Sequence, residues 1–269
     1  MTDLPLPGLS VPGRLGVTAR FDGELTLDLA PYDATLHHGV VRASVVSYVV
    51  DAAAGINADH DPEMWTLTSD LSVRMRPITA PAPISGRCRI LRRGRRSATG
   101  MVELVSADGE PFATGVAGFA YVPRREGDGP KPGMTAEQAP AMLSGLPPLD
   151  APLREAAGIE VLDAAEGVVQ LRVTPELRNP AGTLQGAMVA LIAESAAEDL
   201  VGTRFESPVV VVDLDVRYLA QAPFGPVRSR CRLLGSGPAD PVLVELVDTS
   251  VDRITTVVFA RAVPAVSSR

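Results

Sequence analysis

Two long apolar segments, each with a single carboxylate, dominate the pattern of hydrophobic and polar residues. The first runs from Gly39 to Asn57 and contains Asp51, and the second runs from Asn179 to Glu194. Residues that are apolar on all sides of a helix indicate a helix buried within a domain. Paired valines in the first segment favour a strand, whereas Ala, Met and Leu in the second favour a helix. We predict that both segments are helical.

The two segments belong to an internal repeat. Asp51 and Glu194 are 143 positions apart, and the same offset relates many other residues without a gap. An Arg-Cys-Arg tripeptide around Cys88 also recurs around Cys231. Further matched pairs are Gly39 and Gly182, Asp70 and Asp213, Leu71 and Leu214, Val73 and Val216, and Arg74 and Arg217. The chain is therefore interpreted as a tandem duplication with repeats at 10–123 and 151–266.

Strand patterns follow each predicted helix. A hairpin is expected before the first helix, at 15–21 and 24–29, because Asp22-Gly23 is a strong turn signal. After the helices the expected strands are 65–75, 84–93, 97–106 and 111–122, then 209–219, 227–234, 242–249 and 254–262. One helix followed by four antiparallel strands, twice over, indicates an α+β fold. Residues 124–150, rich in Pro, Gly and charge, are predicted to be a linker with one or two helical turns at 135–143.

Composition narrows the function classes. The net charge of −7 argues against nonspecific nucleic-acid binding. No apolar run approaches the roughly 20 residues needed to span a bilayer. The N-terminus lacks the basic region and apolar core of a signal peptide, so a cytoplasmic protein is expected. Cys88 and Cys231 occupy equivalent positions in different repeats, which favours two packed thiols over one disulfide.

The segment around the second helix resembles a known family. Asn179 precedes a Gly-containing turn, Gln185-Gly186 opens the helix, and Glu194 follows two turns later. This order is similar to that of the hotdog-fold acyl-CoA thioesterases, in particular the phenylacetyl-CoA and 4-hydroxybenzoyl-CoA branch. The following strand, 212–219, and the hairpins at 91–119 extend the resemblance to nearly the whole chain, in two copies. It implies an α+β double hotdog, in which each unit wraps a curved antiparallel sheet around a central helix.

The resemblance also implies active sites at the junction of the two units. The helix N-terminus of one unit supplies a backbone N–H, and the acid comes from the other. Asp51 with Asn179, Gln185 and Gly186 completes this set. If both parts instead came from one unit, Glu194 would be the acid.

The symmetry-related junction departs from the family pattern. Glu194 would face a helix start at which Leu36 replaces the amide and Arg42-Ala43 replaces Gln-Gly. One competent site and one degenerate site are therefore expected.

The implied reaction is hydrolysis of an acyl-CoA thioester to a free acid and coenzyme A, without a metal or another cofactor. The Gly186 N–H and the Asn179 amide would polarise the carbonyl. The carboxylate would act as general base or as nucleophile, and the sequence does not separate the two. A plainer interpretation makes Asn179 a turn or cap residue and Gln185 a polar residue of the first helical turn. The acyl group is not readable from the sequence.

Two further clusters are candidate substrate-binding residues. Arg92, Arg93, Arg95 and Arg96 surround Gly94 and could clamp the phosphates of coenzyme A, or simply form a solvated hairpin turn. His37 and His38 are expected near the mouth of the active site. Three histidines in all, and two cysteines in separate repeats, give no metal-ligand set.

Two other functions remain open. One is a hotdog dehydratase or hydratase, because such enzymes pair a His with a helix acid and His37 lies fourteen positions before Asp51. The Pro-Gly that precedes the acid in those enzymes is absent here. The other is a non-catalytic acyl-CoA-binding module. In each case the expected partner is a small acyl-CoA, and double-hotdog chains could assemble further into a homo-oligomer.

Overall fold

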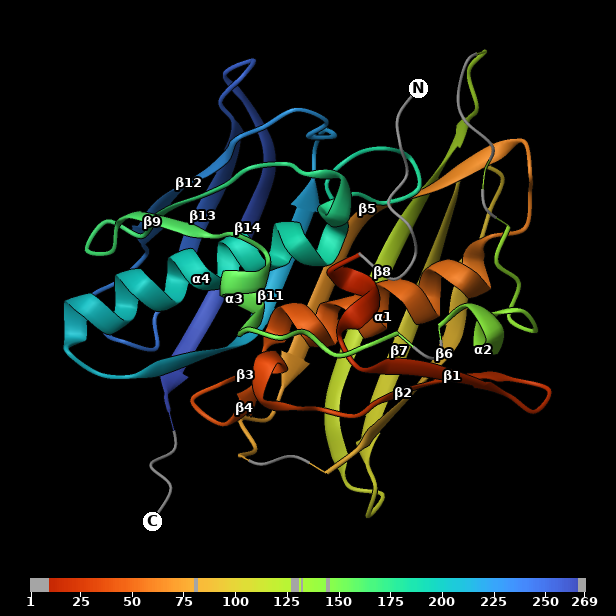
Figure 1. The fold of residues 1–269 in the computed structure, drawn as a ribbon, viewed down its shortest axis with the longest axis horizontal. Coiled ribbons are helices and arrows are strands. Elements are labelled where there is room, and N and C mark those ends of the chain that lie inside the picture. Colours follow the sequence, from red (N-terminus) through yellow and green to blue (C-terminus); the bar gives the residue numbers. More distant parts are fainter. Residues whose placement is uncertain (1–9, 80–81, 127–130, 132, 144–145, 266–269) are drawn as a thin grey trace.

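A computed structural model describes residues 10–79, 82–126, 131, 133–143 and 146–265. Residues 1–9, part of the predicted linker (127–130, 132 and 144–145) and residue 266 of the predicted second repeat lie outside the described residues. The described chain forms one large sheet with two long helices packed against it (Figure 1).

The sheet has twelve antiparallel strands, and its order is symmetric about the middle. From one edge to the other the order is β1-β2-β6-β7-β8-β5-β11-β14-β13-β12-β10-β9. The first half consists of β1 (Val17–Phe21), β2 (Leu25–Leu29), β5 (Met64–Met75), β6 (Ile84–Arg93), β7 (Ser97–Ser106) and β8 (Pro111–Pro123). The second half consists of β9 (Glu160–Asp163), β10 (Val168–Leu171), β11 (Val209–Tyr218), β12 (Val227–Leu233), β13 (Val242–Asp248) and β14 (Arg253–Pro264).

The two halves meet along β5 and β11 in the register that the repeat requires. Ser72 lies opposite Asp215, which is its equivalent at the offset of 143. Two residues away along each strand, Asp70 pairs with Arg217. The central pairing thus relates the repeats by an approximate two-fold axis, and it joins them by backbone hydrogen bonds as well as by the chain.

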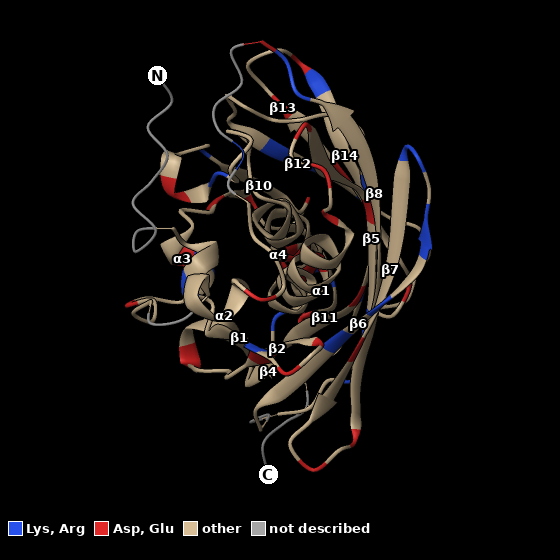
Figure 2. Ribbon diagram, turned by 90° about the vertical axis from the view of Figure 1, so that its right-hand side faces the viewer, with Lys and Arg blue, Asp and Glu red and all other residues tan. Residues whose placement is uncertain are grey.

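The helices α1 (Ala43–Ala58) and α4 (Gly186–Phe205) lie side by side in the hollow of the curved sheet (Figure 2). Their apolar side chains are buried on nearly every face, which explains why neither has an apolar stripe opposed to a polar one. The contact with the sheet is close. A Cβ on Gly115 of β8 would lie 2.4 Å from a Val50 methyl of α1, so only glycine fits there.

The remaining elements are short. They are α2 (Ala139–Met142), α3 (Leu153–Ala156), the two-stranded ribbon β3 (Leu36–His37) and β4 (Val40–Val41), and single 3₁₀ turns at Pro12–Arg14, Asp33–Thr35 and Pro175–Leu177. The ribbon leads into α1 just as the 178–185 loop leads into α4. Gly39 and Gly182 both have positive φ, which explains glycine at these matched turns.

Most predicted elements are confirmed. The first hairpin, both helices and all eight later strands occur within a few residues of their expected positions, and a helical turn lies within 135–143. Burial between α4 and the sheet overrides the strand propensity of the valines in α1. The prediction omitted β9 and β10, the hairpin of the second repeat, because every residue of β9 is exposed and no apolar alternation marks it.

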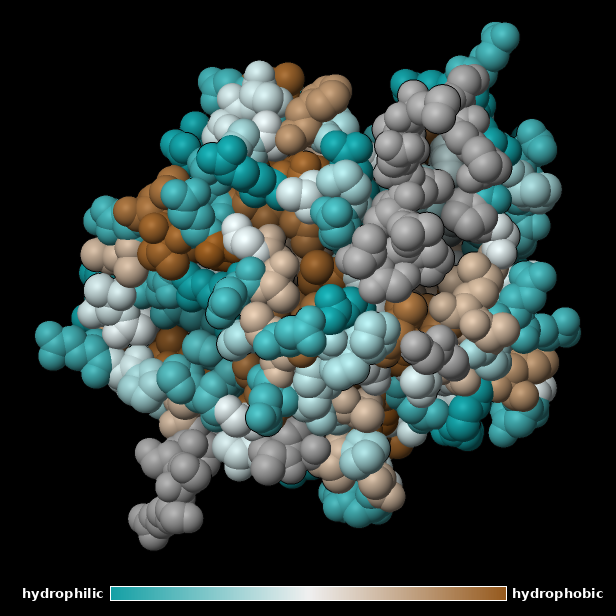
Figure 3. All heavy atoms as spheres, in the orientation of Figure 1, coloured by the Kyte–Doolittle hydropathy of each residue, from teal (hydrophilic) through white to brown (hydrophobic). Residues whose placement is uncertain are grey.

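Cys88 and Cys231 are free thiols on β6 and β12, as predicted. In the part of the chain that the structure describes, no helix is long and apolar enough to cross a membrane. Val161 and Leu162 on the edge strand β9 are exposed, and Figure 3 shows apolar residues gathered on that side of the molecule.

Candidate active site at the junction of the repeats

A cavity of about 740 Å³ lies where the two repeats meet. One wall is a face of α1 whose members recur at helical spacing: Tyr48, Asp51, Ala52, Gly55, Ile56 and Asp59. The opposite wall is the loop that leads into α4, together with the end of β11. Asp51, Asn179, Gln185 and Gly186 all line this one cavity, so the structure brings these four predicted site residues together.

The carboxylate of Asp51 lies against the N-terminus of α4. A Cβ added to Gly186 would be 3.6 Å from Asp51 Oδ2, while Thr68 Oγ1 donates a hydrogen bond of 2.6 Å to Asp51 Oδ1. This carboxylate is partly buried in the cavity wall, and burial raises its pKa to about 6 despite the Thr68 hydrogen bond. The phenols of Tyr48 and Tyr218 line the same cavity. Burial, and then the charge of Asp51, raises the pKa of both.

The start of α4 presents an open backbone donor. Gln185 caps the helix, since its Oε1 accepts a hydrogen bond of 2.6 Å from the Ala187 N–H. Tyr218 Oη donates to the Gly186 carbonyl at 3.1 Å. The Gly186 N–H has no acceptor among the described residues. The positive end of the helix and this free N–H together make a site for negative charge.

Asn179 stabilises the loop that leads into α4. Its Oδ1 accepts hydrogen bonds from the N–H groups of Ala181 at 3.0 Å and Thr183 at 3.2 Å, which is the turn role considered from the sequence. Its Nδ2 group has no acceptor within the described ranges. The amide therefore supports the loop through oxygen and remains able to donate through nitrogen.

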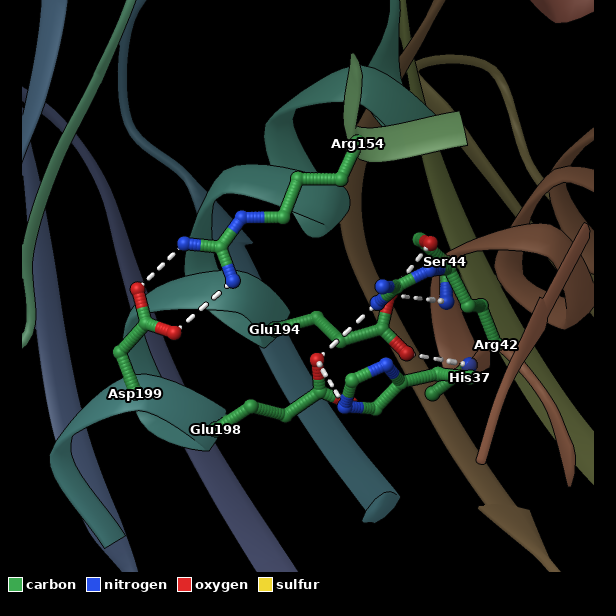
Figure 4. Close-up of polar contacts among 8 residues, drawn as sticks. His37, Arg42, Ser44, Arg154, Glu194, Glu198 and Asp199 are labelled. Carbon is green, nitrogen blue, oxygen red and sulfur yellow. Dashed lines mark hydrogen bonds and ion pairs between the residues drawn. The ribbon is translucent and has the colours of Figure 1, made fainter. Parts of the chain in front are cut away.

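The symmetry-related junction is filled by the protein's own side chains (Figure 4). Glu194, the equivalent of Asp51, accepts hydrogen bonds from the N–H groups of Ala43 at 2.7 Å and Ser44 at 3.4 Å, and from Ser44 Oγ at 2.5 Å. Ala43 occupies the position that corresponds to Gly186. A carboxylate thus sits on the N-terminus of α1, where the first junction has open space.

Two replacements account for the closed state of this junction. Arg42 stands at the position of Gln185, and Glu198 stands at the position of Gly55. Their side chains meet at 3.0 Å, and Arg42 also lies 3.7 Å from Glu194. All three are at least 96% buried. Burial raises the pKa of Glu198 to about 8, and Arg42 opposes this shift.

The histidine pair belongs to this second junction. His37 Nε2 is 3.5 Å from Glu198, and both histidines border a small hollow of about 200 Å³ at the end of α4, away from the residues that line the large cavity. Burial, reinforced by Arg42, lowers the pKa of His37 to about 3, so this ring is neutral.

The arginine cluster lies at the turn between β6 and β7, on the rim of the sheet (Figure 2). Arg92, Arg93, Arg95 and Arg96 are not among the residues that line the large cavity. Arg93 donates to the Asn57 carbonyl at the end of α1, which ties the turn to that helix. Their proposed contact with coenzyme A stays a prediction.

Several site residues were missed from the sequence. The spacing of Tyr48 and Gly55 from Asp51 on α1 could have placed them on one wall, but nothing in the sequence marks Thr68 or Tyr218 as neighbours.

Within the described ranges, no group of three or more His, Cys, Asp or Glu could hold a metal ion.

No protein-family model matches the sequence, and the comparison with curated proteins found no match. Solved structures do share its fold. A tesB protein from Mycobacterium avium subspecies paratuberculosis aligns with a TM-score of 0.62 at 12% identity, over 94% of this chain and 96% of that one. A protein of unknown function with a hot dog fold from Alicyclobacillus acidocaldarius gives 0.61 at 14% identity, over 96% and 98%.

A putative thioesterase II from Thermobifida fusca gives a TM-score of 0.61 at 19% identity, over 94% of this chain and 97% of that one. At such identities the likeness shows the fold. The predicted α+β double hotdog is therefore confirmed over nearly the whole chain.

Proposed function

We propose that the protein hydrolyses acyl-CoA thioesters to free acids and coenzyme A at the junction of Asp51 and Gly186. The observation that carries this proposal is the position of a partly buried carboxylate from one repeat beside the free N–H at the helix start of the other. The arrangement agrees with the resemblance to phenylacetyl-CoA and 4-hydroxybenzoyl-CoA thioesterases. The fold shared with the Thermobifida protein described as a putative thioesterase II gives further support.

The closed junction supports the placement of the substrate. There, a Glu194 oxygen accepts the N–H of Ala43, the equivalent of Gly186. Asp51, the equivalent of Glu194, is one methylene shorter and accepts no hydrogen bond from the Gly186 N–H, so we place the thioester oxygen on that N–H. Negative charge that develops on this oxygen during attack is stabilised by the N–H and by the helix dipole.

The reaction needs one proton acceptor. Water attacks the carbonyl carbon while Asp51 Oδ2 removes its proton. The C–S bond then breaks, and the proton returns to the departing sulfur to give coenzyme A and the free acid. Alternatively, Asp51 attacks the carbonyl carbon directly and the C–S bond breaks, so that coenzyme A leaves as a thiolate. Water then cleaves the resulting anhydride, which regenerates the Asp51 carboxylate, and a proton from the water passes to the thiolate. Thr68 orients the carboxylate in either case.

The rate of thiol release should rise with pH through about 6 and then level off, because only ionised Asp51 accepts a proton. Below that pH the carboxyl is protonated and turnover falls about tenfold per pH unit. Measuring kcat/KM between about pH 4.5 and 8.5 with a medium-chain acyl-CoA tests this. A flat profile would remove Asp51 from the proposed role.

Gly186→Ala should lower kcat/KM at least about tenfold while the protein remains folded. The added methyl would lie 3.1 Å from Tyr218 Oη and would occupy the space beside Asp51 that the thioester needs. Alanine favours a helix more than glycine does, so the unfolding temperature should be retained or raised.

The matched control is Ala43→Gly at the equivalent position of the closed junction. It should slightly lower stability and leave turnover unchanged. Equal losses of activity in both variants would contradict the assignment of catalysis to one junction.

The dehydratase alternative would require His37 next to the catalytic acid. His37 instead contacts Glu198 at the closed junction, and Asp51 has Thr68, Tyr48 and Tyr218 around it. This geometry favours hydrolysis. Hydration of an enoyl-CoA, assayed beside thiol release, separates the two reactions.

A further inference from the structure

The cavity extends from Asp51 in two directions that differ in character. One arm follows α1 from Asp51 to Asp59, and eight residues of helix make it roughly 12 Å long. The other arm passes the loop before α4 and the residues after β11. The chemistry of the two arms indicates which part of a thioester each would hold.

The α1 arm is lined by apolar residues such as Ile56 and Trp65, together with the polar side chains of Thr66, Thr68 and Ser69. The segment that joins the repeats contributes much of its wall, and its described residues 131, 133–143 and 146 are called the strap below. Met134, Leu143 and Leu146 of the strap line the cavity, as do Ile56 and Trp65. Leu146 also packs on the turn at Gly13, where an added Cβ would lie 2.9 Å from Leu146 Cδ1. The strap is thus a packed part of the cavity wall.

The far end of this arm is closed, and its polar groups are satisfied internally. Lys131 Nζ donates to Asp59 Oδ1, to the Asp61 carbonyl at 2.9 Å and to the Met64 carbonyl at 2.8 Å, which uses all three of its protons. Thr66 Oγ1 donates to the same Asp59 oxygen at 2.6 Å. In this partly buried cluster every Lys131 proton is already donated, and the cluster anchors the strap to the end of α1.

The opposite arm carries polar residues beside apolar ones, and its rim is exposed. Arg178, Asn179, Gln221 and Thr256 line it, and Arg178 Nε has no hydrogen-bond partner among the described residues. Leu219, at its rim, is 61% exposed. The amides and phosphates of a pantetheine carrier match this arm, and a hydrocarbon matches the closed one.

We propose that the α1 arm holds the acyl group and that the strap sets its maximum length, about eight to ten carbons of an unbranched chain for a 12 Å arm. This inference rests on the proposed function for the orientation of the thioester. The preferred substrates are then medium-chain aliphatic acyl thioesters. Each methylene that enters the arm tightens binding about fourfold, until the chain meets Lys131 and the strap.

Trp65 allows a test that does not depend on turnover. It is the only tryptophan of the chain, and it lines the α1 arm. Asp51→Asn, which removes the repelling charge, is titrated with free fatty acids of increasing length while the Trp65 emission is followed. We expect the emission to change, with affinity rising about fourfold per carbon up to about ten carbons and falling at least tenfold beyond that length.

Strap variants, made in the same Asp51→Asn background, locate the limit. Leu146→Ala should extend the longest bound chain by about two to three carbons, because it removes three carbon atoms from the wall. Met142→Ala, at a partly exposed strap position that also lines the cavity, should shift the limit in the same direction. Leu91→Ala, at an exposed position outside the cavity, is the matched control and should leave the limit unchanged.

Thiol release from acyl-CoAs of the same lengths, measured with the unsubstituted protein, separates the two proposals. Hydrolysis with no length limit, or with a limit that Leu146→Ala does not move, overturns the strap inference and leaves the proposed hydrolysis standing. A length limit in Trp65 emission without thiol release supports the acyl arm and overturns hydrolysis. Emission that responds to no fatty acid overturns the placement of the acyl group along α1.

Discussion

Replacing Asp51 with Asn should lower the rate of thioester hydrolysis by about 100- to 10,000-fold, because the proposed acceptor of the proton from water is lost. Asparagine has nearly the same shape, and Thr68 Oγ1 can still donate to its Oδ1. The partly buried carboxylate has a pKa of about 6, above its ordinary value, so desolvation of its charge destabilises the folded protein near neutral pH. The variant should therefore unfold at the same temperature as the original protein or higher.

The measurement is thiol release from a panel of aliphatic and aromatic acyl-CoAs, with thermal unfolding of the same samples. Glu194→Gln is the matched variant at the closed junction. It should keep most of its activity and lose stability, because Glu194 accepts two backbone N–H groups of α1. If Glu194→Gln is inactive and stably folded while Asp51→Asn turns over, the acid belongs to the second repeat.

Arg42→Ala should reduce the free energy of unfolding by about 3–5 kcal/mol, the usual cost of removing one partner from a buried ion pair. Arg42 lies 3.0 Å from Glu198 and 3.7 Å from Glu194, and its loss would leave two buried carboxyl groups without a cation. Denaturant unfolding with a two-state fit gives the change directly.

The loss of stability in Arg42→Ala should also depend on pH. The folded-state pKa of Glu198 is already raised to about 8, and removal of Arg42 raises it further. A group with a raised folded pKa stabilises the fold below its unfolded pKa and loses that contribution as pH rises through the folded value. The difference between variant and original should therefore be larger at about pH 9 than at about pH 6.

Arg20→Ala, which removes an exposed ion pair with Asp28, should change stability little at either pH. A similarly small change in Arg42→Ala would mean that the buried cluster does not hold the two repeats together.

The sequence predicted much of the fold because the repeat supplied two independent copies of each pattern. The helix-forming residues of α4 identified α1, whose valines alone favour a strand. The β9–β10 hairpin of the second repeat was not predicted, because β9 is short and all its residues are exposed. The strap was predicted as a linker with one or two helical turns, since Pro and Gly indicate a connection and not what its leucines and methionines contact.

The sequence predicted those parts of the candidate site that occupy matched positions in the two repeats. The repeat offset, with the family resemblance, brought Asp51 to the helix start at Gly186 and Glu194 to the helix start at Ala43, and the structure has both arrangements. The ion pair that fills the second junction joins Arg42 to a residue 156 positions away, on a turn of α4 beyond the recognised motif. Pairwise contacts of this kind depend on the packing of α1 against α4, which periodicity does not specify.

The pairing of Ser72 with Asp215 at the approximate two-fold axis has an evolutionary consequence. In a dimer of identical subunits, residues that meet at such an axis are the same residue, and each mutation appears at both junctions. An arginine that filled one site would fill the other as well. Once the two copies are encoded in a single gene they diverge independently. One junction can then lose its open site and serve only to stabilise the fold. Each chain would then bind a single acyl group, and losing the second site would cost the organism no turnover at the first.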